Sequence, residues 1–541
     1  MKVSAHTRRY HATLLGTTAL VGIAFSAALV FPTPAMCAPK GGMVVAGSAS
    51  IATVGNTTNI VTSTNRTIID WQEFSLNTNE ISNFVQNGNR SAVLNRVTGQ
   101  DPSVLLGALS SNGQVYLINP NGVLIGGGAR IDTAGFVAST LDLSDADFLA
   151  GKYERFSGTS TASVANLGAI DAQGGSVFLI GAQVANAGTI AAPDGTVGLA
   201  AGFHVVLKEA GSEHLYVQAN LPGEGSVGGA GAANSGAIQA AAAEIIAAGG
   251  NMYALAINNT GLIRATAVAH GPDGSIQLVA GAGGSIATSG SLVARRADGS
   301  GGSVTVDSGD GGTTAVAGTI DASGKSGSGT KGGDVTVLGG RIAILDGTHI
   351  DASGDGGGGA VLIGGALHGA DASKVRHASE TYVAPTASID ADARVEGDGG
   401  EVVVWSDRYT DFNGNISARG GALGGDGGQV EVSSHGLLAF DGAADLRAPH
   451  GARGTLLLDP QDIEIDDAPA TDNIASTSTT VAAASFNATP GAQSVFVPTG
   501  QGSASILTTA TLDAELALGD VTVATVGDAH PGAGDITVNG T

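Results

Sequence analysis

The sequence predicts an all-β protein whose short strands coil into a right-handed parallel β-helix. Three observations lead to this fold class. Glycine supplies 86 of the 541 residues while aromatic residues make up only 4%, too few for one large core with stacked rings. The hydrophobic 43% is mostly Ala, Val, Ile and Leu, which suits short strands joined by tight turns. The third observation is that two short motifs recur along the chain.

One motif, Asn-x-Gly-x-Ile, combines a turn with the start of a strand. Its copies begin at intervals of 20, 48 and 25 residues. The middle interval is interpreted as two units of about 24 residues, because repeats of this kind keep a nearly fixed period. The four copies are Asn166–Ile170, Asn186–Ile190, Asn234–Ile238 and Asn259–Ile263. A related Ile-[Asp/Ser]-Ala motif begins at Ile320, Ile350, Ile389 and Ile416.

The other motif is a glycine followed by alternating polar and aliphatic residues. Alternation places the valines on one face of a strand and Ser, Asp, Thr, Gln or Glu on the other. A strand this short buries its apolar face only by stacking on its counterpart in the next coil. With about 22 residues per coil and ~4.8 Å between strands, the chain would form a rod on the order of 100 Å long. Copies are Gly302–Val306, Gly333–Val337, Gly400–Val404 and Gly428–Val432.

Two other repeat architectures, a propeller and an array of sandwiches, were weighed against the β-helix. Propeller blades need about 40–45 residues and a tryptophan-bearing signature. The chain has only Trp71 and Trp405. Glycine-rich insertions at 324–333, 354–359 and 424–428 interrupt the units. They lack the nine-residue period of calcium-binding repeats, so they are predicted to be flexible turns.

The amino-terminal residues resemble a secretory signal. Lys2, Arg8 and Arg9 give a positive start, an apolar run covers 12–31, and small residues near Cys37 suggest cleavage there. An uncleaved membrane anchor is the alternative, since 20 apolar residues can span a bilayer. Cys37 is the single cysteine, so no internal disulfide is expected.

Charge and motif spacing speak against several functions. The net charge of −24 disfavours nucleic-acid binding. Gly324-Lys325-Ser326 lacks the spacing and the strand–helix frame of a phosphate loop. The 11 histidines show no zinc-binding spacing. No catalytic residue, metal or cofactor is therefore predicted, and the protein is expected not to be an enzyme.

An acidic cleft like that of β-helical polysaccharide enzymes is the catalytic arrangement considered most closely. Turn and solvent-face roles explain its aspartates better, because nothing in the spacing brings a basic residue beside them. The acidic residues are Asp351, Asp355, Asp390 and Asp392, and the nearby basic residues are Arg341, Lys374, Arg376 and Arg394.

The segment from Asn56 to Gly158 has larger apolar residues, and twelve asparagines fall between Asn56 and Asn121. Asparagine accepts left-handed turn geometry, so stacked turns here can carry asparagine ladders. The sequence Asn119-Pro120-Asn121-Gly122 follows a predicted strand over 114–118 and predicts a tight turn. Residues 141–156 are predicted to be a helical or irregular excursion, capped by Asp142 or Ser144.

Several blocks in this segment resemble the amino-terminal secretion domain of filamentous-haemagglutinin-type exoproteins. They occur in the family's order over about 100 residues, and a further block of the large exoproteins lies at 454–460. The matching blocks are Arg66–Ser75, Ser91–Gly99, Asn119–Val123, Ala138–Leu141 and Phe148–Gly151.

The resemblance implies two-partner secretion in a Gram-negative bacterium. In this route the Sec translocon delivers an unfolded chain to the periplasm, and a dedicated outer-membrane β-barrel transporter recognises it through periplasmic domains. The chain then folds as it emerges at the cell surface or in the medium. We expect Asn119, Pro120, Asn121 and Gly122 to serve transporter recognition and nucleation of the first coils. An adhesin that contacts a host-cell or surface receptor is the expected function. A toxin-delivery or cytolytic exoprotein and a polysaccharide-degrading enzyme are the alternatives.

The expected organisation has four parts. A signal peptide covers 1–38, and a capped secretion domain covers 39–205, with an extra-helical segment near 141–158. Glycine-rich β-helix repeats cover 206–460. An Ala/Thr/Ser-rich continuation covers 461–541 and is expected to be an incomplete part of the repeat region.

Overall fold

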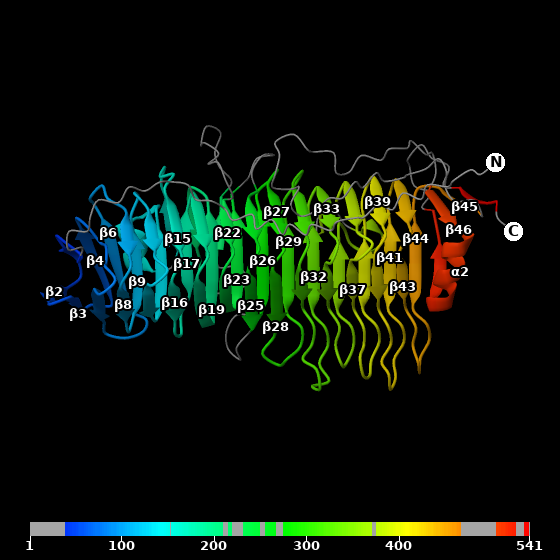
Figure 1. Cartoon of the computed structure of the whole chain (residues 1–541), viewed down its shortest axis with the longest axis horizontal. Helices are drawn as coiled ribbons and strands as arrows, with labels where there is room; N and C mark the ends of the chain where they lie inside the picture. The colour runs from blue at the N-terminus through cyan, green and yellow to red at the C-terminus, as the bar shows by residue number, and fades with distance from the viewer. Residues whose placement is uncertain are drawn as a thin grey trace, which may run out of the picture. The chain divides into compact units, whose positions relative to one another are not determined.

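The computed structural model describes residues 38–151, 153–208, 215–218, 231–248, 255–266, 274–370, 375–466, 505–525 and 535–539. Residues 1–37 lie outside these ranges, so the expected signal peptide does too. Cys37–Thr541 forms one compact unit. Within the described part, strands follow one another in sequence order along a single stack (Figure 1). No described helix has the length and apolar character needed to cross a membrane.

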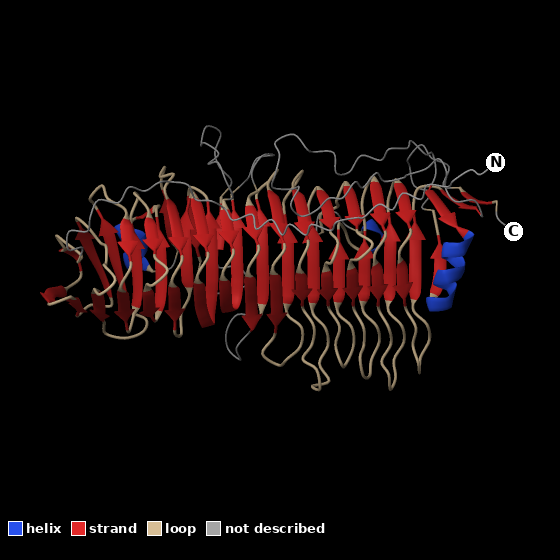
Figure 2. Ribbon diagram, viewed as in Figure 1, coloured by secondary structure: helices blue, strands red, loops and turns tan. Residues whose placement is uncertain are grey.

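Each coil contributes one strand to each of three columns of parallel strands, which confirms the predicted right-handed parallel β-helix (Figure 2). The long strands β19 and β23 bend at a register shift and serve two columns each.

The first column contains β3 (Thr57–Thr62), β5 (Ile81–Val85), β8 (Ala108–Ser111), β11 (Arg130–Thr133), β16 (Ala169–Ala172), β19 (Thr189–Ala201), β23 (Ala237–Ala247), β25 (Leu262–Thr266), β28 (Ser291–Arg295), β31 (Thr319–Asp321), β34 (His349–Asp351), β37 (Ser388–Asp390), β40 (Asn415–Ser417) and β43 (Ala443–Asp445). The second column contains β4 (Arg66–Trp71), β6 (Ala92–Val97), β9 (Gln114–Ile118), β12 (Gly135–Ser139), β17 (Val177–Gly181), the second halves of β19 and β23, β26 (Ser275–Ala280), β29 (Ser303–Asp307), β32 (Asp334–Leu338), β35 (Ala360–Ile363), β38 (Glu401–Val404), β41 (Gln429–Ser433), β44 (Thr455–Asp459) and β47 (Asp520–Val523). The third column contains β7 (Ser103–Leu105), β10 (Val123–Ile125), β15 (Ser163–Asn166), β18 (Gln183–Asn186), β22 (Ala232–Asn234), β24 (Ile257–Asn259), β27 (Ser285–Thr288), β30 (Thr313–Val316), β33 (Arg341–Ile344), β36 (Glu380–Val383), β39 (Tyr409–Phe412) and β42 (Leu437–Phe440).

The core is a continuous set of aliphatic stacks inside the coils. In the first column, the isoleucines of the repeat motif pair directly with one another and are almost completely buried. Each stack removes apolar surface from water on both sides of every coil, which a single short strand cannot do. One such stack is Ile131, Ile170, Ile190, Ile238 and Ile263.

The interpretation of the 48-residue interval as two units is wrong. Ile190 pairs directly with Ile238, and Asn186 pairs with Asn234, so one coil spans the interval. The extra residues leave the stack and include β20 (His204–Leu207) and β21 (Leu215–Val217).

The estimated coil number was also too high. Coils range from 20 to 48 residues between paired isoleucines. The second column has fifteen strands among the described residues, and these span only about 70 Å at ~4.8 Å per strand.

Each end of the described stack carries elements that interrupt strand-on-strand pairing. At the amino-terminal end, β1 (Met43–Ala46) pairs antiparallel with β4, and β2 (Ala49–Val54) pairs antiparallel with β3. This forms the predicted cap. At the other end, α2 (Thr509–Leu518) lies beside β43 (Figure 1). A small parallel sheet there contains β45 (Ile463–Asp466), β46 (Ser505–Thr508) and β48 (Ile536–Val538).

The glycine-rich insertions are not the independent flexible turns predicted from the sequence. They project from one edge of successive coils (Figure 2), and each is bonded to its neighbours through the backbone. Gly356 N donates to Thr330 O at 3.0 Å, and Gly397 N donates to Gly424 O at 2.8 Å. Many of these glycines leave no room for a Cβ atom. Small residues are therefore needed because the loops stack closely, rather than because they move.

Candidate functional site

The predicted recognition turn lies at the corner between β9 and β10. Gly122 N donates to Asn119 O at 3.0 Å, and Gly122 adopts φ +119°. The Asn119 Oδ1 atom accepts from the backbone N of Asn121 at 2.9 Å and from its Nδ2 at 3.1 Å. The turn therefore has the tight, asparagine-supported geometry that the sequence predicts.

The four residues of this turn separate into buried and exposed positions. Asn119 is completely buried, whereas Pro120 and Asn121 are exposed. The Asn119 Nδ2 atom donates to Asp101 O at 2.9 Å and to Ser103 Oγ at 3.0 Å. Asn121 Nδ2 donates to Gly99 O at 2.9 Å. Both asparagines thus bind the turn to the preceding coil, and only Pro120 and Asn121 present surface in the folded state.

An extra-helical sheet lies next to this turn and confirms the predicted excursion. It contains β13 (Asp142–Leu143), β14 (Glu154–Ser157), β20 and β21 in antiparallel order. The helix α1 (Asp145–Ala150) separates β13 from β14, and Ser144 is its cap, because Ser144 Oγ accepts from Asp147 N at 3.1 Å. The participation of β20 and β21 carries no signal in the local sequence. The boundary predicted after residue 205 falls within β20.

A buried polar triad fixes this sheet to the coils. Arg66 Nη1 lies 3.3 Å from Glu154 Oε1, and Tyr116 donates its hydroxyl to the same oxygen at 3.2 Å. The Arg66 guanidinium also stacks 4.9 Å from the centroid of the Phe148 ring. Burial raises the pKa of Glu154, and the Arg66 charge opposes that rise. Burial raises the pKa of Tyr116 as well. The triad was not predicted, since its members lie 38 to 88 residues apart.

Arg96 forms a second, more exposed connection to the excursion. Its Nε lies 3.0 Å from Asp142 Oδ1, and its Nη2 lies 2.8 Å from Asp145 Oδ1. Nη2 also donates to Leu143 O at 2.8 Å. Both arginines lie in blocks that match the family resemblance, which explains in part why charged residues occur within those blocks.

The asparagines of the repeat motif form an internal ladder. Asn166, Asn186, Asn234 and Asn259 are each at most 1% exposed. Each Nδ2 donates to the next Oδ1 at 2.8, 2.8 and 2.9 Å, and Asn259 donates on to Thr288 Oγ1 at 3.1 Å. A shorter ladder links Asn59, Asn83 and Ser110 in the segment where the sequence predicts one.

The aspartates considered for an acidic cleft mainly serve turns. Asp351 Oδ1 accepts from Ser353 N at 2.8 Å, and Asp392 Oδ1 accepts from Arg419 N at 2.7 Å. One statement from the sequence needs correction, because a basic residue does lie beside them. Arg394 Nε is 3.2 Å from Asp355 Oδ1, and its Nη1 is 4.0 Å from Asp351 Oδ2. Register stacking brings them together across the 39 residues of one coil.

An aromatic and imidazole cluster occupies the corner after the second column and was missed by the sequence analysis. Asp407 Oδ1 lies 3.0 Å from His377 Nδ1 and 3.5 Å from His435 Nδ1. The Trp405 ring packs edge-on against His435, with 4.7 Å between centroids. The His435 side chain is 52% exposed, so its imidazole is open to a ligand. The signal was the spacing of 28 residues between Asp407 and His435, which is one coil.

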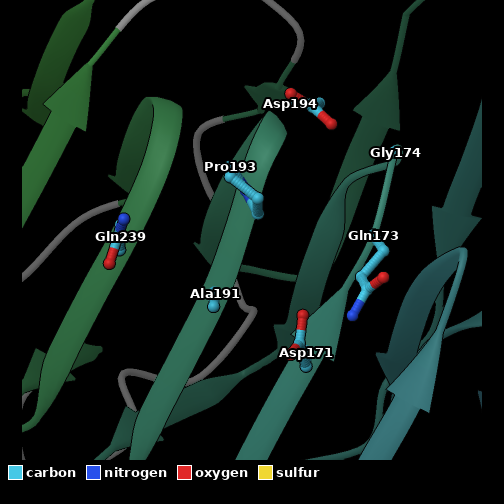
Figure 3. A pocket seen from close by; sticks show the side chains of 7 residues that line it. All are labelled: Asp171, Gln173, Gly174, Ala191, Pro193, Asp194 and Gln239. Atoms are coloured by element: carbon cyan, nitrogen blue, oxygen red, sulfur yellow. The ribbon is translucent and has the colours of Figure 1, made fainter.

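A shallow depression lies on the first column (Figure 3). Its lining includes carboxylates and amides but no cationic, imidazole or thiol group. It therefore offers hydrogen bonds without an obvious nucleophile or acid–base pair. The lining residues are Asp171, Gln173, Gly174, Ala191, Pro193, Asp194 and Gln239.

Comparisons with known proteins agree with this architecture. Residues 35–281 match the model of the TPS (two-partner secretion) domain family. The crystal structure of the HMW1 secretion domain from Haemophilus influenzae aligns with 78% of this chain and 100% of its own, at 30% identity and a TM-score of 0.53. The fold and the matched region define a right-handed parallel β-helical exoprotein. The chain belongs to the two-partner secretion family.

Two curated relatives are heme/hemopexin-binding proteins from Haemophilus influenzae. One is 46% identical over 105 residues, and the other is 44% identical over 75 residues. The alignments cover 19% and 14% of this chain. The chain spans only 12% and 8% of the length of those relatives.

Proposed function

We propose that this exoprotein leaves the cell through an outer-membrane β-barrel transporter that recognises its amino-terminal secretion domain. The observation that carries this proposal is the match of residues 35–281 to the TPS domain, together with the capped first coils. The Sec translocon delivers the chain to the periplasm, and folding takes place outside the cell.

In this scheme, the turn at Asn119–Gly122 acts in two ways. Pro120 and Asn121 are exposed and available to a transporter, whereas Asn119 is buried and joins the coil to the one before it. Asn119 therefore acts in nucleation rather than in direct contact with a folded recognition surface. A coil of about 22 residues contributes ~1–3 kcal/mol at the usual stability per residue. That gain on the outside of the membrane disfavours return of the chain.

Export is tested by expressing the full chain with and without the transporter gene and measuring the chain in the medium. Replacing Asn119→Ala and Asn121→Ala together should leave the precursor in the periplasm. The control is Asn89→Ala, because Asn89 is an exposed asparagine of the same segment. Undiminished export of the double variant would reject the role of the turn. Transporter-independent export would reject the whole route.

For the activity of the exported chain, we propose adhesion. An extended stack with exposed loops along one edge presents a long surface to a host-cell or surface receptor (Figure 2). Bacteria that do not adhere on their own should adhere to host cells when they express the chain and its transporter. Adhesion equal to that of cells without the chain would reject this activity. No catalytic role is proposed for any residue.

A second candidate is haem or hemopexin binding, which the names of the two relatives suggest. The cluster of His377, Trp405 and His435 favours it, because an exposed imidazole beside an aromatic ring can ligate and stack on a haem. Haem titration of the purified chain should then produce a Soret shift that His435→Ala removes. An unchanged spectrum in the wild-type chain would reject haem binding at this cluster.

A further inference from the structure

Glu431 is buried at a position that the sequence pattern predicts to face solvent. In β41, Val430 and Val432 point into the core, so Glu431 points outward from the sheet. Its side chain is nevertheless 0% exposed. The cover is the 3₁₀ turn η1 (Leu367–Gly369), which belongs to the connection between β35 and β36 and contacts β41.

The backbone of η1 is held over Glu431 from two sides. The His368 backbone N donates to Glu431 Oε2 at 2.7 Å. His368 has φ +56°, the one positive value found for a non-glycine residue among those described. The following residue, Gly369, packs so closely on Trp405 that a Cβ atom would lie 2.5 Å from the ring. These contacts place the His368 imidazole beside the carboxylate, with 4.0 Å between Nδ1 and Glu431 Oε2.

A second carboxylate completes the cluster from the next coil. Asp459 ends β44 and pairs in register with Ser433, two residues after Glu431. Asp459 is 6% exposed. One ligand atom from each of His368, Glu431 and Asp459 lies within 4.8 Å of the others. The three residues come from the connection after β35, from β41 and from β44, so they meet only when the coils have stacked.

The charge of this cluster is not balanced by the groups around Glu431. Glu431 Oε1 is buried and has no hydrogen-bond partner. Among the described residues, His368 is the one basic group within ion-pair distance of Glu431. A buried carboxylate with an unpaired oxygen costs free energy unless it gains a proton or a cation. Here a second carboxylate and an imidazole point to the same space, which favours a cation.

We propose that His368, Glu431 and Asp459 bind a divalent transition-metal ion such as Zn²⁺. One imidazole nitrogen and two carboxylate oxygens suit zinc better than Ca²⁺ or Mg²⁺, which prefer oxygen ligands alone. Ligand atoms around a tetrahedral zinc ion lie about 3.3 Å apart. A small closure of the cluster provides this spacing, because the His368 side chain is 58% exposed and can rotate. Solvent can occupy the fourth position.

The bound ion would connect separate coils in a chain that has a single cysteine. A disulfide formed in the periplasm would stop an unfolded chain from passing a transporter. The metal ligands are separated by 63 and 28 residues, so the site forms only after stacking and does not hinder passage. The ion therefore acts as a late crosslink between the coils of β35, β41 and β44.

The test is zinc binding by the purified full chain after chelator treatment, measured against a competing metal indicator. The wild-type chain should bind one more zinc ion per chain than His368→Gln, and both His368→Gln and Glu431→Gln should lower the affinity roughly tenfold or more. His450→Gln is the control, because His450 is exposed and lies outside the cluster. Thermal unfolding provides a second measurement, since Zn²⁺ should raise the midpoint of the wild type and not that of His368→Gln.

Two results would overturn the proposal. Equal zinc stoichiometry in the wild type and His368→Gln would show that the ion binds elsewhere. A wild-type chain without zinc binding, together with a Glu431→Gln variant of unchanged thermal midpoint, would show that Glu431 simply carries a proton. Because His368 is mostly exposed, His368→Gln should fold normally, and circular dichroism checks this.

Discussion

Asn186 Nδ2 donates to Asn234 Oδ1 at 2.8 Å, although 48 residues separate the two side chains. The bond shows that the coil which includes the excursion through β20 and β21 closes in the same register as its neighbours. A buried ladder of this kind specifies register, because a slip of one residue would leave amide groups unpaired.

The asparagine ladder should contribute measurably to stability. Asn186→Ala removes one bond to Asn166 and one to Asn234, and it leaves buried amide atoms without partners. We expect a loss of about 1–3 kcal/mol in the free energy of unfolding. Denaturant titration measures it. Asn258→Ala is the matched control, because Asn258 in β24 is only half-buried and its neighbour Asn259 carries the ladder. Equal effects of the two variants would argue against the ladder.

The glycine of the repeat motif should be irreplaceable where backbones stack. A Cβ atom on Gly236 would lie 2.0 Å from Gly188 O in the neighbouring coil. Gly236→Ala should therefore force the coils apart and destabilise the chain by about 1–3 kcal/mol or more. A Cβ on Gly128 meets no atom within 4 Å, so Gly128→Ala should change the denaturation midpoint little. A tolerated Gly236→Ala would contradict the close stacking.

Glu515 should make the end of the stack sensitive to pH. Its Oε2 accepts from Ala444 N at 2.9 Å, so α2 satisfies a backbone group at β43. Burial raises the pKa of Glu515 to about 7 from 4.5. The folded state then holds a proton that the unfolded state loses, so stability decreases as pH rises from about 4.5 to 7.

Glu515→Gln keeps an acceptor and removes this titration. The variant should match the wild type near pH 4.5 and exceed it by about 1–2 kcal/mol at pH 8, a value reduced for partial solvent screening. Hydrogen exchange of peptides that contain β43 and α2 reports the local opening free energy. A wild type whose protection relative to the variant does not change with pH would contradict the raised pKa.

The sequence was sufficient for the fold class because the motifs repeat the local physics of each coil. Asn-x-Gly-x-Ile names a ladder amide, a glycine under close backbone contact and a core isoleucine, and all three functions appear at Asn234, Gly236 and Ile238. The 48-residue interval was misread because an insertion in one coil has the same length as two coils.

Features that depend on distant segments could not be predicted in this way. Glu431 alternates with valines like any outward residue, and its cover comes from a turn 63 residues earlier. Glu154 meets Arg66 across 88 residues for the same reason. The burial of Asn119 depends on Asp101 and Ser103 in the preceding coil, which a turn motif does not encode.

The most direct test of a single continuous stack is a disulfide between paired residues of β19 and β23. Ala191 pairs with Gln239 on the outer side of the first column. In a Cys37→Ser background, Ala191→Cys with Gln239→Cys should form an intramolecular disulfide in the secreted chain, visible as a mobility shift that a reductant reverses. The pair Ala191→Cys and Thr319→Cys, several coils apart, should not crosslink. If the first pair stays reduced under oxidising conditions, or crosslinks no better than the second, the coils do not stack as described.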